Sequence, residues 1–219
     1  MSLAIFDLDN TLLNGDSDHA WGEFMVRHNI VEPEFYRRQN DHFYELYKQS
    51  QLDIMEYLEF ALAPLTRFSL EELDLLHRQF MQEFVAPMRQ RKADELLRKH
   101  REQGDFLLII TATNRFVTAP IARALGVDDL LATDPERVGN RYTGRVKGVP
   151  CYQHGKVERL QEWLADTEHS LDNSYFYSDS INDLPLLEQV THPFVVDGDE
   201  RLQAEARQRN WPMISLRDA

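Results

Sequence analysis

Cysteine and positive charge are both scarce in this chain. Its 219 residues include a single cysteine, Cys151, which excludes an internal disulfide framework and makes a reducing compartment the default expectation. The 24 lysines and arginines are outnumbered by 37 aspartates and glutamates, so the formal net charge is −13. Nucleic-acid binding and docking on an anionic membrane both favour a basic surface. We therefore expect neither nucleic acid nor membrane among the partners, whereas a small anionic substrate remains compatible with a local site.

Long apolar runs, internal repeats and low-complexity tracts are also absent from the sequence. No apolar stretch approaches the roughly 18 residues of a membrane-spanning helix. The N-terminus shows no basic segment followed by an apolar one, so no signal peptide is predicted and we expect a cytoplasmic protein, as a monomer or a homodimer. The apolar content of 42% is enough to bury a core, and the length suits one domain or a core with a smaller insert.

The pattern of apolar residues changes along the chain. Residues 1–14 predict a short buried strand followed by a polar turn, and residues 17–84 show helical spacing without a convincing strand. From about residue 90 onward, buried strands alternate with helices, which predicts a parallel sheet covered on both faces. We therefore predict an α/β fold with a Rossmann-like parallel sheet and an inserted helical unit. Further strands of that sheet are predicted at residues 106–110, 130–132, 175–177, 194–196 and 213–214.

Aspartates gather where predicted strands end. Asp7 and Asp9 lie two residues apart on an extended segment, and Asp179 and Asp183 follow a later strand. Open α/β folds bind ligands at this edge of the sheet, and several carboxylates there repel one another unless a cation is present. Mg²⁺ is the expected cation, because no set of histidines and cysteines has the spacing of a zinc site. The alternative, that these residues form turns and helix caps, suits Asp183 alone better than all four together.

Hydrogen-bond donors follow the same strand ends. Thr111 comes after a buried strand, Asn182 opens a predicted helix, and Lys156 lies in the first turn of another helix. Phosphate binds to hydroxyl, amide and helix N-terminal donors and to lysine. Each of the three residues has an ordinary structural explanation when taken alone, so their value comes from the joint pattern.

The order of these motifs resembles the haloacid dehalogenase superfamily. Asp7-Leu8-Asp9-Asn10-Thr11, then Thr111, Lys156 and Asp179-Ser180-Ile181-Asn182-Asp183 follow that superfamily's pattern along nearly the whole chain. The helical insert is similar to a C1 cap, which implies a core of residues 1–14 and 87–219 and a cap of residues 15–86. The Asn182-Asp183 pair is typical of subfamily IB, the phosphoserine-phosphatase-like hydrolases.

The resemblance implies roles for these residues. Asp7 would attack phosphorus and form an aspartyl-phosphate, while Asp9 would protonate the leaving oxygen and then activate water. Mg²⁺ would be held by Asp7, Asp179 and the backbone carbonyl of Asp9. Thr111 and Asn182 would bind phosphate oxygens, Lys156 would neutralise charge, and Asp183 would anchor Lys156 or a metal-bound water. Because Asp9 supplies a proton that a halide leaving group does not need, the resemblance implies a phosphatase and not a dehalogenase.

The substrate is expected to be a small phosphorylated metabolite with an amino group. The chain departs from phosphoserine phosphatases at Ser180, where they usually have glycine, and its Tyr-Ser-Asp-Ser-x-Asn-Asp-Leu-Pro stretch is similar to histidinol-phosphatase-type members. We therefore favour histidinol phosphate, with phosphoserine next. Asp16 could pair with the substrate's ammonium group, although one of Asp16 and Asp18 could instead cap the next helix, a role that the sequence favours more for Asp18 than for Asp16. The aromatic stripes of the insert are interpreted as helix packing.

Two other functions are open at this point. One is a phosphomutase or phosphotransferase on the same scaffold. The other is a phospho-acceptor signalling module, because receiver domains also combine acidic residues, Thr or Ser, and Lys around Mg²⁺. The length of the chain and the insert after the first strand argue against a receiver domain.

Overall fold

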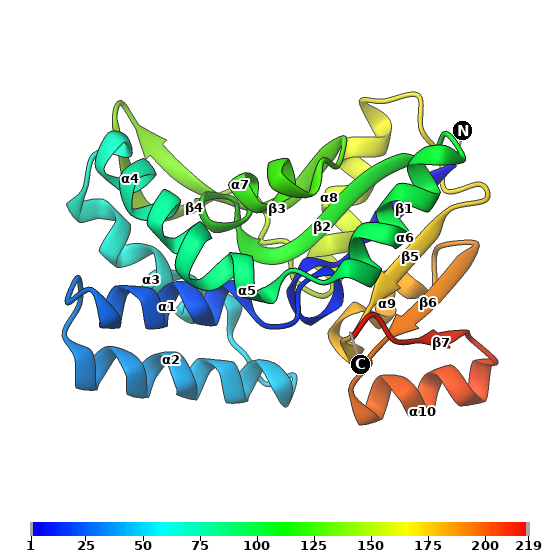
Figure 1. Cartoon of the computed structure of the whole chain (residues 1–219), viewed down its shortest axis with the longest axis horizontal. Coiled ribbons are helices and arrows are strands. Elements are labelled where there is room, and N and C mark those ends of the chain that lie inside the picture. The colour runs from blue at the N-terminus through cyan, green and yellow to red at the C-terminus, as the bar shows by residue number, and fades with distance from the viewer. Residues whose placement is uncertain (1, 218–219) are drawn as a thin grey trace.

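One seven-stranded sheet forms the centre of the computed structural model, which describes residues 2–217 (Figure 1). The strand order is β4-β3-β2-β1-β5-β6-β7, and every pair is parallel except the β3–β4 hairpin at one edge. β1 lies at the middle of the sheet, so the residue that follows it is surrounded by neighbouring strands. The strands are β1 (Leu3–Phe6), β2 (Phe106–Asn114), β3 (Asp129–Val138), β4 (Arg141–Lys147), β5 (Tyr175–Ser178), β6 (His192–Val196) and β7 (Met213–Ile214).

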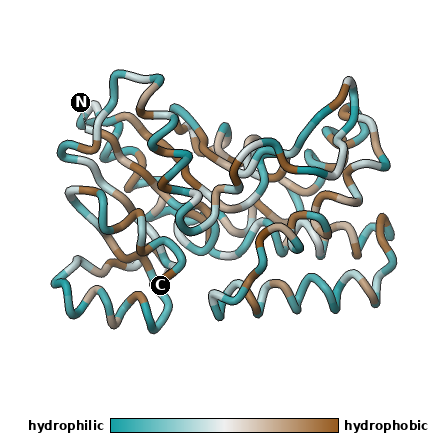
Figure 2. Tube along the Cα trace, turned by 180° about the vertical axis from the view of Figure 1, so that it is seen from behind, coloured by the Kyte–Doolittle hydropathy of each residue, from teal (hydrophilic) through white to brown (hydrophobic). Residues whose placement is uncertain are grey.

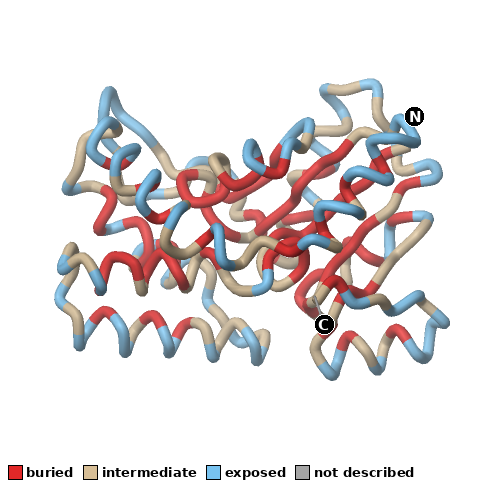
Figure 3. The backbone as a smooth tube through the Cα atoms, viewed as in Figure 1, coloured by how far each residue is buried: buried red, intermediate tan, exposed pale blue. Residues whose placement is uncertain are grey.

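Both faces of the sheet are covered by helices, as the alternation of side chains in β1 illustrates. Ala4 and Phe6 pack into the apolar cluster that includes α6 (Arg91–Glu102) and α7 (Arg115–Leu125). Leu3 and Ile5 pack into the cluster on the opposite face. All four side chains are fully buried, and the central strands form the buried centre of the molecule in Figure 3. The helices of this second face are α8 (His154–Ala165), α9 (Leu184–Leu187) and α10 (Glu200–Arg209).

A helical segment leaves the sheet after β1 and returns to it before β2. An aromatic cluster joins this segment to the core, since Trp21 of α1 makes edge-on contacts with Phe80 of α4 and Phe116 of α7. α2 alternates between hydrophilic and apolar residues in Figure 2, which fits a helix with one buried side. The helices are α1 (Ser17–Arg27), α2 (Pro33–Lys48), α3 (Ile54–Leu62), α4 (Leu70–Phe80) and α5 (Ala86–Met88). That residues 15–86 form a separate cap domain stays a prediction.

The predicted α/β fold class is confirmed, and both β2 and β3 are longer than the sequence pattern predicted. Sequence patterning ended β2 at Ile110, but the strand continues to Asn114 through a register shift against β3. Asn114 ends the strand because its side chain caps α7, accepting a hydrogen bond from the Val117 N–H. Thr111 therefore lies within β2. In the described part of the chain, no helix is both long and apolar enough to span a membrane.

Candidate active site

A buried lysine joins two of the predicted aspartates beyond the ends of β1 and β5. Lys156 Nζ lies 2.7 Å from Asp7 Oδ1 and 2.8 Å from Asp183 Oδ2. Asp183 also accepts a 2.7 Å hydrogen bond from the Ser178 hydroxyl. The three charged groups come from distant parts of the sequence: the parallel pairing of β1 and β5 brings Asp7 and Asp183 together, and Lys156 reaches them from the first turn of α8. Asp7 is the residue directly after β1, with its backbone N–H bonded to the Tyr177 carbonyl.

The charges of this cluster depend on one another. Burial disfavours the charged form of Lys156, but the carboxylates of Asp183 and Asp7 outweigh that effect and raise the pKa of the ammonium group above its usual value. Burial raises the pKa of Asp7 from 3.8 to about 7, although Lys156 opposes the rise. The lysine is therefore held positive, and Asp7 ionises more readily when further positive charge arrives.

Asp179 completes the acidic group and makes it a suitable site for a divalent cation. The Thr11 hydroxyl lies 3.1 Å from Asp179 Oδ1 and 3.5 Å from Asp7 Oδ2, so one side chain spans the two carboxylates. Burial, and then the charge of Asp7, raises the pKa of Asp179 well above its usual value. When Asp7, Asp179 and Asp183 are all ionised, the single positive charge of Lys156 leaves two of their negative charges uncompensated. The donor set of hard oxygens and this charge deficit both fit Mg²⁺.

Asp9 lies in an irregular turn and is held by two donors. Its Oδ1 accepts a 2.6 Å hydrogen bond from the Ser17 N–H, and its Oδ2 accepts a 2.7 Å bond from the Thr113 hydroxyl. The turn is possible because Asn10 adopts a left-handed conformation with φ of 57°. Burial, and then the charge of Asp16, raises the pKa of Asp9 to about 7. A carboxyl group with this pKa can give or take a proton near neutral pH.

Thr111 and Thr113 both face the site from β2. Both line the same cavity as Asp7, and Thr111 Oγ1 accepts a hydrogen bond from the Thr113 N–H. Thr111 was predicted to bind phosphate, whereas the contact of Thr113 with Asp9 was not predicted. The sequence could have indicated Thr113, because it lies two residues after Thr111 and side chains two apart on a strand point to the same side.

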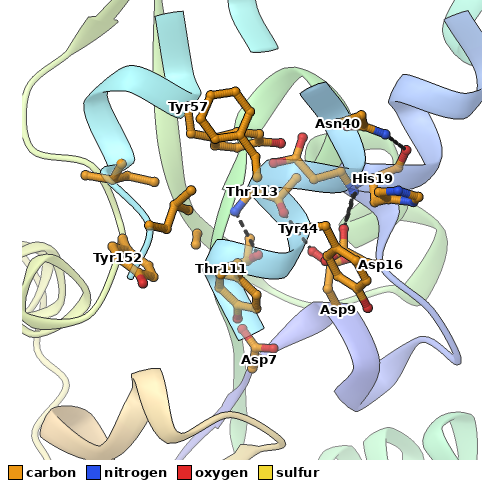
Figure 4. A pocket seen from close by; sticks show the side chains of 16 residues that line it. Asp7, Asp9, Asp16, His19, Asn40, Tyr44, Tyr57, Thr111, Thr113 and Tyr152 are labelled. Carbon is orange, nitrogen blue, oxygen red and sulfur yellow. Dashed lines mark hydrogen bonds between the residues drawn. The ribbon is translucent and has the colours of Figure 1, made fainter. Parts of the chain in front are cut away.

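The cavity holds about 570 Å³ of space unfilled by protein atoms, including space open to solvent. Figure 4 shows it from close by, with Asp7 and Tyr57 at opposite ends of the view. Within the described residues, no lysine or arginine lines it. The lining residues are Asp7, Asp9, Asp16, Asp18, His19, Asn40, Phe43, Tyr44, Tyr47, Leu52, Ile54, Tyr57, Thr111, Ala112, Thr113 and Tyr152.

Asp16 caps α1 and also faces the cavity. Its Oδ1 accepts hydrogen bonds from the N–H groups of Asp18 and His19, at 2.9 and 2.8 Å. The sequence had favoured Asp18 as the helix cap, and this was wrong. Asp18 instead lies in the first turn of α1, where it contributes a second carboxylate to the cavity wall. Burial raises the pKa of Asp16, and that of Asp18 from 3.8 to about 8, with the charge of Asp16 adding to the latter shift.

An aromatic wall closes the cavity on the side of the insert. Phe43, Tyr44 and Tyr47 of α2 and Tyr57 of α3 all line it. Interpreting these aromatic residues as helix packing alone was therefore incomplete. Burial raises the pKa of Tyr47 and Tyr57 well above the usual value, so both hydroxyls stay neutral. The wall offers flat rings and neutral donors to a ligand.

Asn182 contacts the helical segment and is not among the cavity-lining residues. Its Oδ1 accepts a 2.5 Å hydrogen bond from the Ser50 hydroxyl, and its Nδ2 donates to the Tyr47 carbonyl at 3.1 Å. Arg201 of α10 binds the same end of α2 through the Lys48 carbonyl at 2.8 Å. The residue predicted to bind phosphate therefore holds the end of α2 in this structure, and its role toward phosphate stays a prediction.

The chain is similar to known phosphatases over its full length. The family model described as haloacid dehalogenase-like hydrolase matches residues 4–188. A histidinol-phosphatase from Neisseria meningitidis serogroup C (strain 8013) is 42% identical over 220 residues, covering 99% of each chain. The phosphoserine phosphatase SerB1 of Mycobacterium tuberculosis (strain ATCC 25618 / H37Rv) is 31% identical, covering 99% of this chain and 71% of its own.

Solved structures share the fold. A protein of unknown function from Bordetella pertussis Tohama I is 44% identical, with a TM-score of 0.93 and 99% of each chain covered. A substrate-bound phosphoserine phosphatase is 15% identical, with a TM-score of 0.72 over 97% of this chain and 92% of its own, so that likeness concerns the fold alone.

Proposed function

The chain belongs to the haloacid dehalogenase-like hydrolase family, and we propose that it hydrolyses phosphate monoesters whose alcohol carries an amino group, with histidinol phosphate favoured and phosphoserine next. The observation that carries the proposal is the charge of the cavity. Asp7 and Lys156 meet at one end, while the remaining wall presents the carboxylates of Asp16 and Asp18 and no lysine or arginine among the described residues. A leaving group with a positive charge would compensate that wall.

The first chemical step would transfer the phosphoryl group to Asp7. A carboxylate oxygen of Asp7 forms the new bond to phosphorus as the bond between phosphorus and the alcohol oxygen breaks. Asp9 gives its proton to that oxygen, for which its pKa of about 7 is suitable. Lys156, held 2.7 Å from Asp7, offsets the negative charge at the reacting group.

The second step would return the enzyme to its starting state. Water attacks phosphorus, the bond to Asp7 breaks, and Asp9 accepts the proton of the water. Mg²⁺ bound by Asp7, Asp179 and the Asp9 carbonyl would neutralise phosphate charge. Thr111, on the cavity wall, would donate to a phosphate oxygen, and Asn182 would do so where its contacts with α2 open.

Release of inorganic phosphate from a panel of esters tests this function. The panel contains histidinol phosphate, phosphoserine, phosphoethanolamine, sugar phosphates and p-nitrophenyl phosphate, each assayed with Mg²⁺ and with EDTA. We expect the amino-bearing esters to be preferred, EDTA to stop release, and Asp7→Asn to lower kcat by more than about 10³-fold while keeping the melting temperature.

Four outcomes would count against the proposal. Preference for a sugar phosphate would remove the amino-bearing substrate class, and substantial activity of Asp7→Asn would remove Asp7 as the nucleophile. Phosphate release that falls as an acceptor alcohol is added would indicate a phosphotransferase, and stable phosphorylation of Asp7 without turnover would indicate a signalling module.

A further inference from the structure

Asp18 is a carboxylate at the cavity wall that the proposed chemistry does not use. It lies two residues beyond the helix cap Asp16, so α1 does not require its side chain as a cap. Its described partners are the Tyr57 hydroxyl and, at 3.5 Å, the side-chain amide of Asn114. Both partners are neutral, and the carboxylates of Asp16 and Asp9 act on Asp18 with charge of the same sign, which raises its pKa further.

A carboxylate in these surroundings is costly without a cation or a strong donor opposite it. The hydrogen bonds from Tyr57 and Asn114 compensate part of the lost hydration, but no ion pair does so within residues 2–217. The nearby His19 side chain is directed elsewhere, since its Nε2 lies 2.8 Å from Asp41 Oδ1. The missing partner is therefore expected to come from the ligand.

The shape of the cavity indicates which part of a ligand reaches Asp18. Asp7 and Asp9 lie where the phosphate and the leaving oxygen would be, and Asp16 would take the ammonium group. Asp18 of α1 and Tyr57 of α3 both line the cavity, and the ring of Tyr57 packs edge-on against that of Phe43, with the ring centres 5.4 Å apart. A flat nitrogen-containing ring could stack on the aromatic wall and donate to Asp18.

We propose that Asp18, supported by the Tyr57 hydroxyl, binds a second nitrogen donor of the leaving alcohol, beyond the ammonium group that Asp16 would take. This inference rests on the proposed function and deepens it. Asp18 thereby selects esters with two nitrogen-bearing groups, of which histidinol phosphate is one, over esters with a single ammonium group. Asp18 is a specificity residue and takes no part in the transfer of the phosphoryl group.

The test compares three substrates on the Asp18→Asn variant. Histidinol phosphate carries two nitrogen groups, phosphoethanolamine one, and p-nitrophenyl phosphate no donor nitrogen. We expect kcat/KM for histidinol phosphate to fall by about 10–100-fold, mainly through KM, because a hydrogen bond to a charged group is lost. The other two substrates should change by less than about 3-fold, a difference that a merely structural role would not produce.

Two further variants complete the test. Tyr57→Phe removes only the hydroxyl and should lower the histidinol phosphate rate in the same selective way, so the proposal is tested even if Asp18→Asn folds poorly. Glu59→Gln removes an exposed carboxylate from the same helix as Tyr57 and should leave all three substrates unchanged. Equal losses on all three substrates, or no loss on histidinol phosphate, would overturn the role of Asp18. Absence of phosphate release from all three substrates by the unaltered protein would instead reject the phosphatase function itself.

Discussion

The two ends of the cavity differ in how their carboxylates are compensated. At the core end, Asp7 and Asp183 share the ammonium group of Lys156 at 2.7 and 2.8 Å. At the end formed by the helical insert, the donors that Asp16 and Asp18 find among residues 2–217 are all neutral. The chemistry of phosphoryl transfer is thus built into the chain, whereas the wall that faces the leaving group needs positive charge from outside. The core end can therefore transfer the phosphoryl group of many esters, and the charge of the wall selects among their leaving groups.

The largest effect is expected when Lys156 is replaced. Both ends of the cavity would then lack a cation, so the difference between them would disappear. In Lys156→Met, Asp7 and Asp183 would face each other without a cation, so we expect kcat to fall by about 10³-fold or more and the melting temperature to drop. Steady-state kinetics and thermal unfolding measure the two effects. Lys99→Met, an exposed lysine on α6, is the matched control and should change neither quantity. A variant that retains more than a tenth of the activity would show that Lys156 is not required.

A smaller effect is expected when Asp9 loses one of its two donors. Thr113→Val removes the hydroxyl that lies 2.7 Å from Asp9 Oδ2 and should lower kcat by about 10–100-fold for alkyl phosphates. The loss should be much smaller for p-nitrophenyl phosphate, because its leaving group needs little help from a proton. Comparing the two substrates on one variant supplies the control. Equal losses would mean that Thr113 acts on something other than the proton transfer.

The smallest effect concerns the free energy of unfolding, which the buried carboxyl group of Asp18 lowers. Burial raises the pKa of Asp18 to about 8, so between about pH 4 and pH 8 the folded protein holds a proton that the unfolded chain has released. Rising pH therefore lowers the free energy of unfolding of the ligand-free protein within that window. Asp18→Asn removes this penalty, and its melting temperature in EDTA should exceed that of the unaltered protein by roughly 4 °C at pH 8.

At pH 5 the same gap should shrink to about a quarter of its size at pH 8, because the unfolded chain has then gained stability from ionisation over only about one of the four pH units between the two pKa values. Glu59→Gln should show no gap that grows with pH. A gap that shrinks or reverses between pH 5 and pH 8 would contradict the assignment of Asp18 as an uncompensated carboxylate.

The core end was easier to predict from the sequence than the wall. Asp7 and Asp183 follow the parallel strands β1 and β5, and topology alone then brings them to one edge, while Lys156 was indicated by its place in the first turn of a helix. Phe43 and Tyr47 recur at helical spacing, which packing against a neighbouring helix produces just as well as a cavity wall. Asp16 and Asp18 both lie near the start of α1, where either suits a cap, and only the backbone conformation decides that Asp16 takes that position. The contact of Asn182 with Ser50 depends on how the insert meets the core, for which no local pattern exists.

The most direct test of the account compares histidinol phosphate with its deamino analogue, which lacks the ammonium group but keeps the phosphate and the ring. The ratio of their kcat/KM values on the unaltered protein measures what positive charge contributes at the uncompensated wall. We expect histidinol phosphate to be preferred by about 30-fold or more near neutral pH, as a charged hydrogen bond would produce. Equal values for the two esters, or preference for the analogue, would contradict this expectation.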